Sequence, residues 1–148
     1  MSHKLPVSVL VVIHTVDLEV LLLERARRPG FWQSVTGSLD WAGEPFEAAA
    51  AREVGEETGI DATRHRLEAW NLQNVFEIYP IWRHRYAPGV THNTEHVFGL
   101  TVPRDVEVRV APREHLQARW LAWREAAEQV FSWSNRKAIL ALAERTSH

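Results

Sequence analysis

The chain contains no cysteine, which excludes disulfide bonds and any chemistry that depends on a thiolate. It also lacks a strong charge of either sign. Lysine and arginine total 17 against 19 aspartate and glutamate residues, so the formal net charge is only −2. Without a basic stripe, long nucleic acid is not an expected ligand. The eight histidines show no HExxH-type spacing, and we therefore predict no histidine metal site.

Long apolar runs are missing as well. The run 7–13 is too short to span a bilayer, and the N-terminus has no signal-peptide pattern. We therefore expect a cytoplasmic protein without a membrane partner. What remains is an ordinary globular composition, 45% apolar and 24% charged, over 148 residues. That length predicts a single domain over residues 1–148 with a sizeable core.

Strand and helix signals are both present along the chain. β-Branched and aliphatic runs predict strands at 7–13, 20–24, 31–35, 67–70, 75–81, 95–102, 107–110 and 119–121. Helices are predicted over 123–131 and 134–145, the second with Ser134 as its N-cap. Strands around one glutamate-rich helix, with further helices at the end, indicate an α+β fold, an α/β/α sandwich.

The glutamate-rich helix carries the strongest chemical signal. Pro45 and Gly59 frame a helix over 45–58. Within it, Glu53, Glu56 and Glu57 stand at i, i+3 and i+4, on one face. Like charges so placed repel by a few tenths of a kcal/mol per pair. Because Mg²⁺ and Mn²⁺ prefer hard oxygen ligands, either ion would remove this repulsion, and the cluster predicts a divalent metal site. The alternative is an acidic helix face in solvent.

The segment around this cluster resembles the Nudix box, G-x5-E-x7-R-E-U-x-E-E-x-G-U, in which U is a large aliphatic residue. From Glu44 onward the match is complete: seven residues separate it from Arg52, and 52–60 reads REVGEETGI. The first glycine departs from the pattern, since six residues separate Gly37 from Glu44 and Ser38 occupies the expected position. Either the loop carries one extra residue, or serine replaces glycine.

The resemblance extends over about residues 4–139, to a branch of the Nudix hydrolases that acts on dihydroneopterin triphosphate. It rests on the segments 31–38, 83–91, 114–116 and 132–135. It implies a mixed sheet between helices and a Mg²⁺-dependent hydrolysis, with Mn²⁺ as a substitute, that yields dihydroneopterin monophosphate and pyrophosphate in folate biosynthesis. Two other functions stay open: a Nudix hydrolase of (deoxy)nucleoside triphosphates or dinucleoside polyphosphates, and a non-catalytic nucleotide-binding module. The intact glutamates argue against the module. The sequence leaves the oligomeric state open.

By this resemblance, Glu53 and Glu57 bind Mg²⁺, with Glu56 in or beside the same shell. Glu114 is implied to supply a further carboxylate from a loop, against the alternative of an exposed loop residue. The helix glutamates Glu53, Glu56 and Glu57 are also the catalytic candidates. A general base must reach the attacking water, and the spacing does not decide between Glu56, Glu57 and Glu114 for that role.

Supporting and substrate-binding residues complete the predicted site. The family pattern implies that Glu44 and Arg52 form a supporting pair between loop and helix. Cations at strand ends are expected to meet the phosphates, and an aromatic segment is expected to stack on the pterin while Glu77 or backbone groups bind its edge. The alternatives are surface charges and core residues of a strand. The predicted substrate contacts are Lys4, Arg25, Thr36, Phe76, Glu77, Ile78, Tyr79 and Ser132.

Overall fold

The computed structural model describes residues 3–146, so the ends of the predicted domain, residues 1–2 and 147–148, lie outside the described range. Its strands are β1 (Val7–His14), β2 (Glu19–Arg25), β3 (Trp32–Gln33), β4 (Val35–Ser38), β5 (Arg66–Glu77), β6 (His92–Thr101) and β7 (His115–Ala122). Its α-helices are α1 (Phe46–Thr58), α2 (Trp123–Gln129) and α3 (Trp133–Thr146), and the 3-10 helices are η1 (Ala62–Arg64) and η2 (Pro80–Arg85).

The strands form one seven-stranded mixed sheet with β1 at its centre. β6 runs parallel to β1 along its whole length and pairs with β5 on its other side. On the opposite side of β1, β4 pairs with its middle and β2 meets it at His14, while β7 lies against β2. All pairings except that of β1 with β6 are antiparallel.

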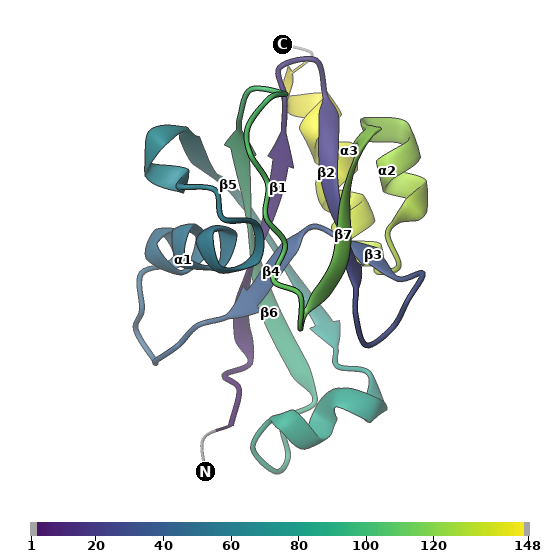
Figure 1. Cartoon of the computed structure of the whole chain (residues 1–148). Coiled ribbons are helices and arrows are strands. Elements are labelled where there is room, and N and C mark those ends of the chain that lie inside the picture. The colour runs from purple at the N-terminus through teal and green to yellow at the C-terminus, as the bar shows by residue number, and fades with distance from the viewer. Residues whose placement is uncertain (1–2, 147–148) are drawn as a thin grey trace.

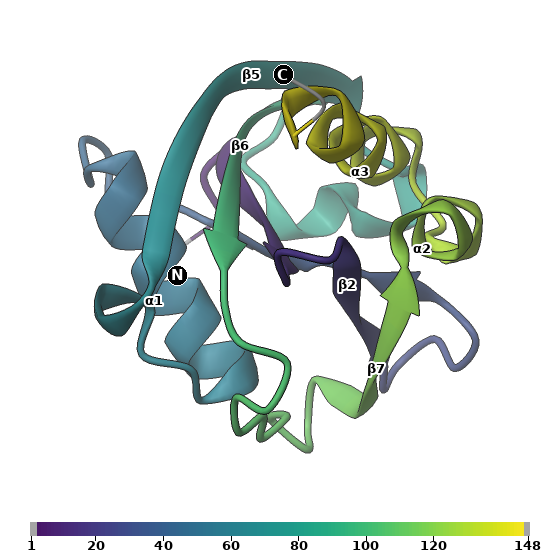
Figure 2. The ribbon, with the colours of Figure 1, turned by 90° about the horizontal axis from the view of Figure 1, so that it is seen from above.

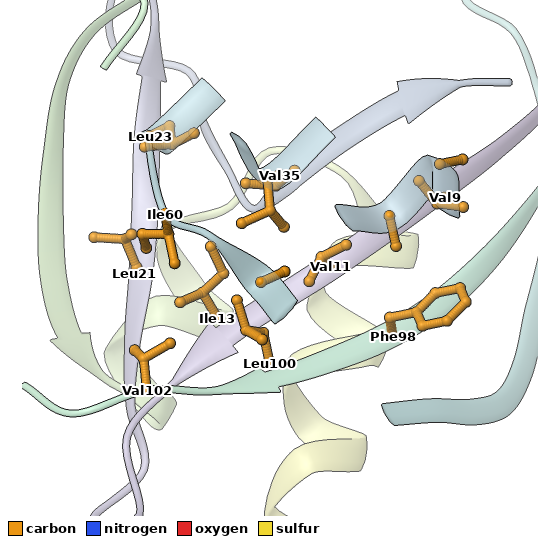
Figure 3. Close-up of a cluster of buried hydrophobic side chains, with 14 of the residues drawn as sticks. Val9, Val11, Ile13, Leu21, Leu23, Val35, Ile60, Phe98, Leu100 and Val102 are labelled. Atoms are coloured by element: carbon orange, nitrogen blue, oxygen red, sulfur yellow. The ribbon is translucent and has the colours of Figure 1, made fainter. Parts of the chain in front are cut away.

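Helices cover both faces of this sheet. Figures 1 and 2 show α1 on one side and α2 with α3 on the other. Because side chains alternate along a strand, β1 sends Val9, Val11 and Ile13 to the α1 side, and Leu10 and Val12 to the other. The α1-side cluster is drawn in Figure 3. Burial on both faces explains the unbroken apolar run of β1. The predicted α+β sandwich is confirmed.

The glutamate-rich helix has the predicted boundaries to within one residue. Pro45 immediately precedes α1, and Gly59 follows it with φ 74°. In this left-handed conformation the Gly59 N–H donates to the Gly55 carbonyl at 3.0 Å. Glycine tolerates such a φ without a Cβ penalty, so the local sequence is sufficient to end the helix here.

Two strand predictions are wrong. Residues 107–110 form no strand, because their valines pack on the α1-side core while the Arg109 N–H donates to the Thr58 carbonyl at 2.8 Å. The strand predicted over 75–81 ends at Glu77, since Pro80 lacks an N–H and begins η2. β5 instead continues back through 71–74, with a register shift near Asn71, whose φ is 54°.

Two hydrogen bonds explain further differences. The strand predicted over 31–35 is broken at Ser34, whose N–H donates to Asn135 Oδ1 at 2.8 Å and not to a neighbouring strand. The N-cap of α3 is Ser132, which accepts from the Asn135 N–H at 3.2 Å, and not the predicted Ser134. Ser134 lies within the first turn and is buried. Among the helices of residues 3–146, none combines the length and apolarity that crossing a membrane requires.

Candidate functional site

A cavity of about 790 Å³ lies where the ends of β2, β5 and β6 approach α1 and the first turn of α3. This volume falls within the range of about 300–1,000 Å³ that is usual for small-molecule sites. Its wall takes side chains from both α1 and α3. These two helices cover opposite faces of the sheet (Figure 2). The cavity therefore draws on both helical layers.

Glu53 and Glu57 lie one turn apart on α1, and both line the cavity. Glu57 is only 2% exposed, and its Oε1 has no hydrogen-bond partner. Burial, followed by the adjacent carboxyl group of Glu53, raises the pKa of Glu57 well above its ordinary value. The pair thus places negative charge where solvent stabilises it poorly and where a nearby cation would favour the charged form.

Gly37 on β4 makes room for one of these carboxyl groups. A Cβ at position 37 would overlap the carboxyl group of Glu53. The neighbouring Ser38 contacts Arg52 and not Glu53: its carbonyl accepts from Arg52 Nη2 at 3.2 Å. This geometry gives Gly37 the position of the box glycine and favours the interpretation in which the following loop carries one extra residue.

Arg52 joins that loop to α1. Its Nε and Nη2 donate to the two carboxylate oxygens of Glu44 at 3.2 and 3.1 Å, a bidentate arrangement. Glu44 is buried and also accepts from the Asp40 N–H at 2.8 Å. Arg52 Nη1 donates to Glu53 Oε1 at 2.7 Å. The same guanidinium therefore fixes the loop and holds Glu53 beside Glu57.

The other two predicted carboxylates are placed differently. Glu56 is 57% exposed, does not line the cavity, and lies 3.5 Å from Arg52 Nη1. Glu114 is exposed on the loop before β7 and does line the cavity. Its charge contributes to the raised pKa of Glu57, after burial and Glu53. The structure thus brings Glu53, Glu57 and Glu114 to one cavity and leaves Glu56 at its outside.

The residues present fit a hard divalent cation. Within residues 3–146 no three histidine or acidic side chains converge closely enough to form a complete metal site by themselves. Glu53 and Glu57 nevertheless supply carboxylate oxygens, and the unpaired Oε1 of Glu57 is a buried acceptor that a cation would satisfy. Mg²⁺ typically uses one or two carboxylates and completes its shell with water and substrate phosphates, so this pair matches its needs.

Two predicted phosphate contacts line the same cavity. Partial burial lowers the pKa of Lys4, while the charges of Glu53 and Glu57 act in the opposite direction. Arg25 donates from Nη1 to Gln33 Oε1 at 3.0 Å, but its buried Nε has no partner. An unpaired guanidinium N–H in a cavity wall is a ready donor to a phosphate oxygen.

The predicted ring-binding segment, residues 76–79, spans the end of β5, and all four of its residues line the cavity. Phe76 is half-buried, Ile78 is buried and Tyr79 is partly exposed. Glu77 is directed elsewhere: its side chain is 68% exposed, and its carboxylate accepts from Arg83 Nη2 at 2.9 Å. The segment therefore offers apolar and aromatic surface, while its carboxylate is engaged outside the buried wall.

Thr36 and Ser132 also line the cavity. The Thr36 hydroxyl donates to the Val9 carbonyl at 3.1 Å, and its backbone N–H favours the charged form of Glu57. The Ser132 hydroxyl is occupied in capping α3, as described above. Both residues are therefore held in place by contacts within the protein.

His115 is a cavity residue that the sequence interpretation missed. It is buried, and its Nε2 lies 3.7 Å from Glu57 Oε1. Burial, followed by the positive charge of Arg25, lowers the pKa of His115 to about 4, so the ring is neutral at pH 7. This contact is accordingly not an ion pair at neutral pH. Only the neighbouring Glu114 marked this position, because no histidine spacing did.

Three further polar residues were missed because their partners are distant in sequence. Asn135 accepts from the Ser34 N–H at 2.8 Å and donates to the Ser34 hydroxyl at 2.9 Å, 101 residues away. These bonds hold α3 against the chain that leads into β4. Asn93 and Glu95 line the cavity from β6 and are buried. The sequence holds one signal for them: the two residues are two positions apart, as on one face of a strand, and they precede the apolar residues that begin at position 97.

Comparisons with known proteins agree with this geometry. A family profile described as the NUDIX domain matches residues 4–142. The dihydroneopterin triphosphate diphosphatase of Escherichia coli K12 is 49% identical over 93% of this chain and 91% of its own length. The protein of that name from Haemophilus influenzae is 37% identical, over 94% and 88%. A solved structure of the E. coli dihydroneopterin triphosphate pyrophosphohydrolase superposes with a TM-score of 0.86 at 47% identity, covering 94% of this chain and 95% of that one.

Proposed function

The chain belongs to the NUDIX family, and from that premise we propose that it hydrolyses dihydroneopterin triphosphate to dihydroneopterin monophosphate and pyrophosphate. The observation that carries this proposal is the 49% identity to a dihydroneopterin triphosphate diphosphatase over 93% of the chain. The cavity supports it, because it combines buried carboxylates, cations and aromatic surface in one wall. The proposed unit is a single domain over residues 1–148 that takes a small triphosphate and not long nucleic acid, in the cytoplasm.

NUDIX hydrolases generally use divalent metal ions, and we propose Mg²⁺ here, with Mn²⁺ as a substitute. Glu53 and Glu57 would hold the ion, with Glu114 as a further carboxylate and Glu56 beside them. When bound, such an ion polarises phosphoryl oxygens and lowers the pKa of coordinated water. Occupation would also favour the ionised form of Glu57, which burial and Glu53 otherwise disfavour.

The remaining residues position the substrate. Lys4 and the free Nε of Arg25 neutralise the phosphate chain, and the segment 76–79 with Ser132 encloses the ring. Arg52 and Glu44 hold the loop and Glu53 in register with Glu57. Among the carboxylates that line the cavity, Glu57 is the most protected from solvent, and with a cation bound it would be ionised and could accept a proton from water.

The test is pyrophosphate release with Mg²⁺ from dihydroneopterin triphosphate, GTP, dGTP and ATP at equal subsaturating concentrations. We expect a preference of at least about tenfold for the pterin, with release abolished by a chelator. Equal or faster nucleotide turnover would retain NUDIX hydrolysis and reject the pterin substrate. No release from any of the four would reject the proposed function.

A matched pair of variants tests the metal carboxylates. Glu57→Gln removes a proposed ligand and should lower kcat on the order of a hundredfold or more without unfolding the chain. Glu47→Gln removes an exposed carboxylate in the first turn of the same helix, outside the cavity, and should leave kcat unchanged. Equal rates in wild type and Glu57→Gln would overturn the assignment.

A further inference from the structure

Polar side chains gather on three adjacent strands at the α3 side of the cavity. Glu95 on β6 pairs in register with Ser8 on β1 and with Asn74 on β5. Asn93 lies two residues before Glu95 and therefore faces the same side of the sheet. All four side chains are at least 94% buried, with relative exposures from 2% to 6%. Ser134 of α3 is buried above them and lines the cavity with Ser8, Asn93 and Glu95.

These groups do not satisfy one another. Asn93 Nδ2 donates to the Ser8 hydroxyl at 2.7 Å, which leaves Asn93 Oδ1 as an acceptor without a partner. Ser134 and Asn74 lie beside Glu95 and favour its charged form, yet Glu95 Oε1 also has no partner of hydrogen-bond geometry. Asn74 Nδ2, a buried donor beside Glu95, also has no partner, but Asn74 does not line the cavity. Buried acceptors are almost always paired in folded proteins, so the unpaired Asn93 Oδ1 and Glu95 Oε1 in the cavity wall indicate that a ligand supplies donors there.

The position of these acceptors limits what that ligand portion is. They lie on β6 beside Phe76, the cross-strand partner of Asn93, and not on α1 with Glu53 and Glu57. Phosphate oxygens carry negative charge and offer no donors, so they are unsuited to a carboxylate and an amide oxygen. A flat heterocycle with adjacent N–H groups satisfies both acceptors and presents a face to the neighbouring aromatic ring.

We propose that Glu95 Oε1 and Asn93 Oδ1 recognise the ring of the substrate by accepting hydrogen bonds from a ring N–H and its adjacent exocyclic amino group. This inference rests on the proposed function and deepens it by naming the recognised edge. Pterin and guanine both present this 2-amino-4-oxo edge with two neighbouring donors. Adenine presents a ring nitrogen acceptor beside its amino group. The lone pair of that nitrogen would face the lone pairs of Glu95 Oε1, and this contact is repulsive.

Glu95 takes the part that the sequence interpretation gave to Glu77. The Glu77 carboxylate is mostly exposed and already paired with Arg83, whereas Glu95 is enclosed and its Oε1 has no hydrogen-bond partner. Burial also raises the pKa of Glu95 to about 7. A ligand N–H that donates to Glu95 favours its ionised form, so ligand binding and the charge of Glu95 support each other.

The first test measures specificity in Glu95→Gln, which replaces one acceptor oxygen by an amide N–H₂. We expect kcat/KM for dihydroneopterin triphosphate and GTP to fall on the order of tenfold to hundredfold, while kcat/KM for ATP changes less than about threefold. Glu68→Gln removes a carboxylate of β5 that lies outside the cavity, and it should alter none of these values. A uniform loss on all three substrates, or no loss, would overturn the proposal.

The second test does not depend on turnover. Calorimetric titration without metal should show neopterin and guanosine binding to the wild-type chain more tightly than adenosine, with this difference lost in Glu95→Gln and in Asn93→Ala. Equal binding of guanosine and adenosine by the wild type would overturn the recognition site. If the wild type releases pyrophosphate from dihydroneopterin triphosphate but Glu95→Gln keeps its substrate preference, the recognition proposal fails while the proposed function stands. If neopterin binds selectively but no pyrophosphate is released, the proposed function fails while the recognition proposal stands.

Discussion

Replacing Glu95 by glutamine should stabilise the unliganded fold at alkaline pH and have little effect near pH 5. Burial raises the pKa of Glu95 from 4.5 to about 7 in the folded chain. Below pH 4.5 the carboxyl group is protonated in both the folded and the unfolded states, so stability is unaffected. Between these values the unfolded chain releases a proton that the folded chain keeps, and the free energy of unfolding falls as pH rises.

The magnitude follows from the two pKa values. Each pH unit between about 4.5 and 7 removes about 1.4 kcal/mol, so the folded state is weaker by about 3 kcal/mol above pH 7 than below pH 4.5 through this one group. Glutamine carries no charge at any of these pH values and retains one acceptor oxygen. The advantage of Glu95→Gln over the wild type should therefore grow from less than about 1 kcal/mol at pH 5 to about 3 kcal/mol at pH 8.

Urea unfolding at pH 5, 6, 7 and 8, without ligand or metal, measures this difference directly. The other titrating groups, Glu57 and His115 among them, are present in both proteins and cancel in the comparison. Glu68→Gln provides a control for the loss of a carboxylate outside the cavity. A Glu95→Gln difference that stays constant from pH 5 to pH 8 would refute the reasoning that burial holds a proton on Glu95.

Three further predictions follow from packing. Gly55→Ala should raise the free energy of unfolding by up to about 1 kcal/mol in urea denaturation, because position 55 is exposed in the last turn of α1 and an added Cβ meets nothing closer than 3.9 Å; a decrease would contradict this. Asn135→Ala should cost about 2–3 kcal/mol in the same assay, since it leaves the buried Ser34 N–H unpaired; Asn135→Asp, which keeps the acceptor, should cost less. Gly37→Ala should lower kcat/KM at least about tenfold by displacing the Glu53 carboxylate, and unchanged kinetics would contradict its proposed place in the site.

The features predicted well from sequence are those determined within a few residues. The boundaries of α1 depend on Pro45 and on the left-handed Gly59, both of which act locally. The strand predicted over 107–110 failed because alternation reports only that one side of an extended segment is buried. Here that side packs on the core, while the backbone has one bond to the end of α1 in place of a strand partner. Alternation carries no information on the hydrogen-bond partner.

The same division applies to the site. The spacing of Glu53 and Glu57 placed both on one face of α1, and both line the cavity. Glu56 stands at i+4 from Arg52, lies 3.5 Å from its Nη1 and does not line the cavity, and this choice between partners is not visible in the spacing. Asn135 was not predicted as a contact of Ser34 because that pairing exists only after the two ends of the chain have packed together.

Glu57 and Glu95 are two buried carboxyl groups of one cavity, and we propose that they serve different parts of the ligand, the metal-bound phosphates and the ring. Each carboxyl group is buried, each has a raised pKa, and each keeps an Oε1 without a hydrogen-bond partner. They belong to different layers, since Glu57 lies on α1 and Glu95 faces the α3 side of the sheet, and neither is held by the other's neighbours. In the proposed function, a cation would satisfy the first and N–H donors of the substrate ring would satisfy the second. The empty fold is therefore weakened at both places, and each ligand portion restores stability where it binds, which is the expected cost of a preorganised site.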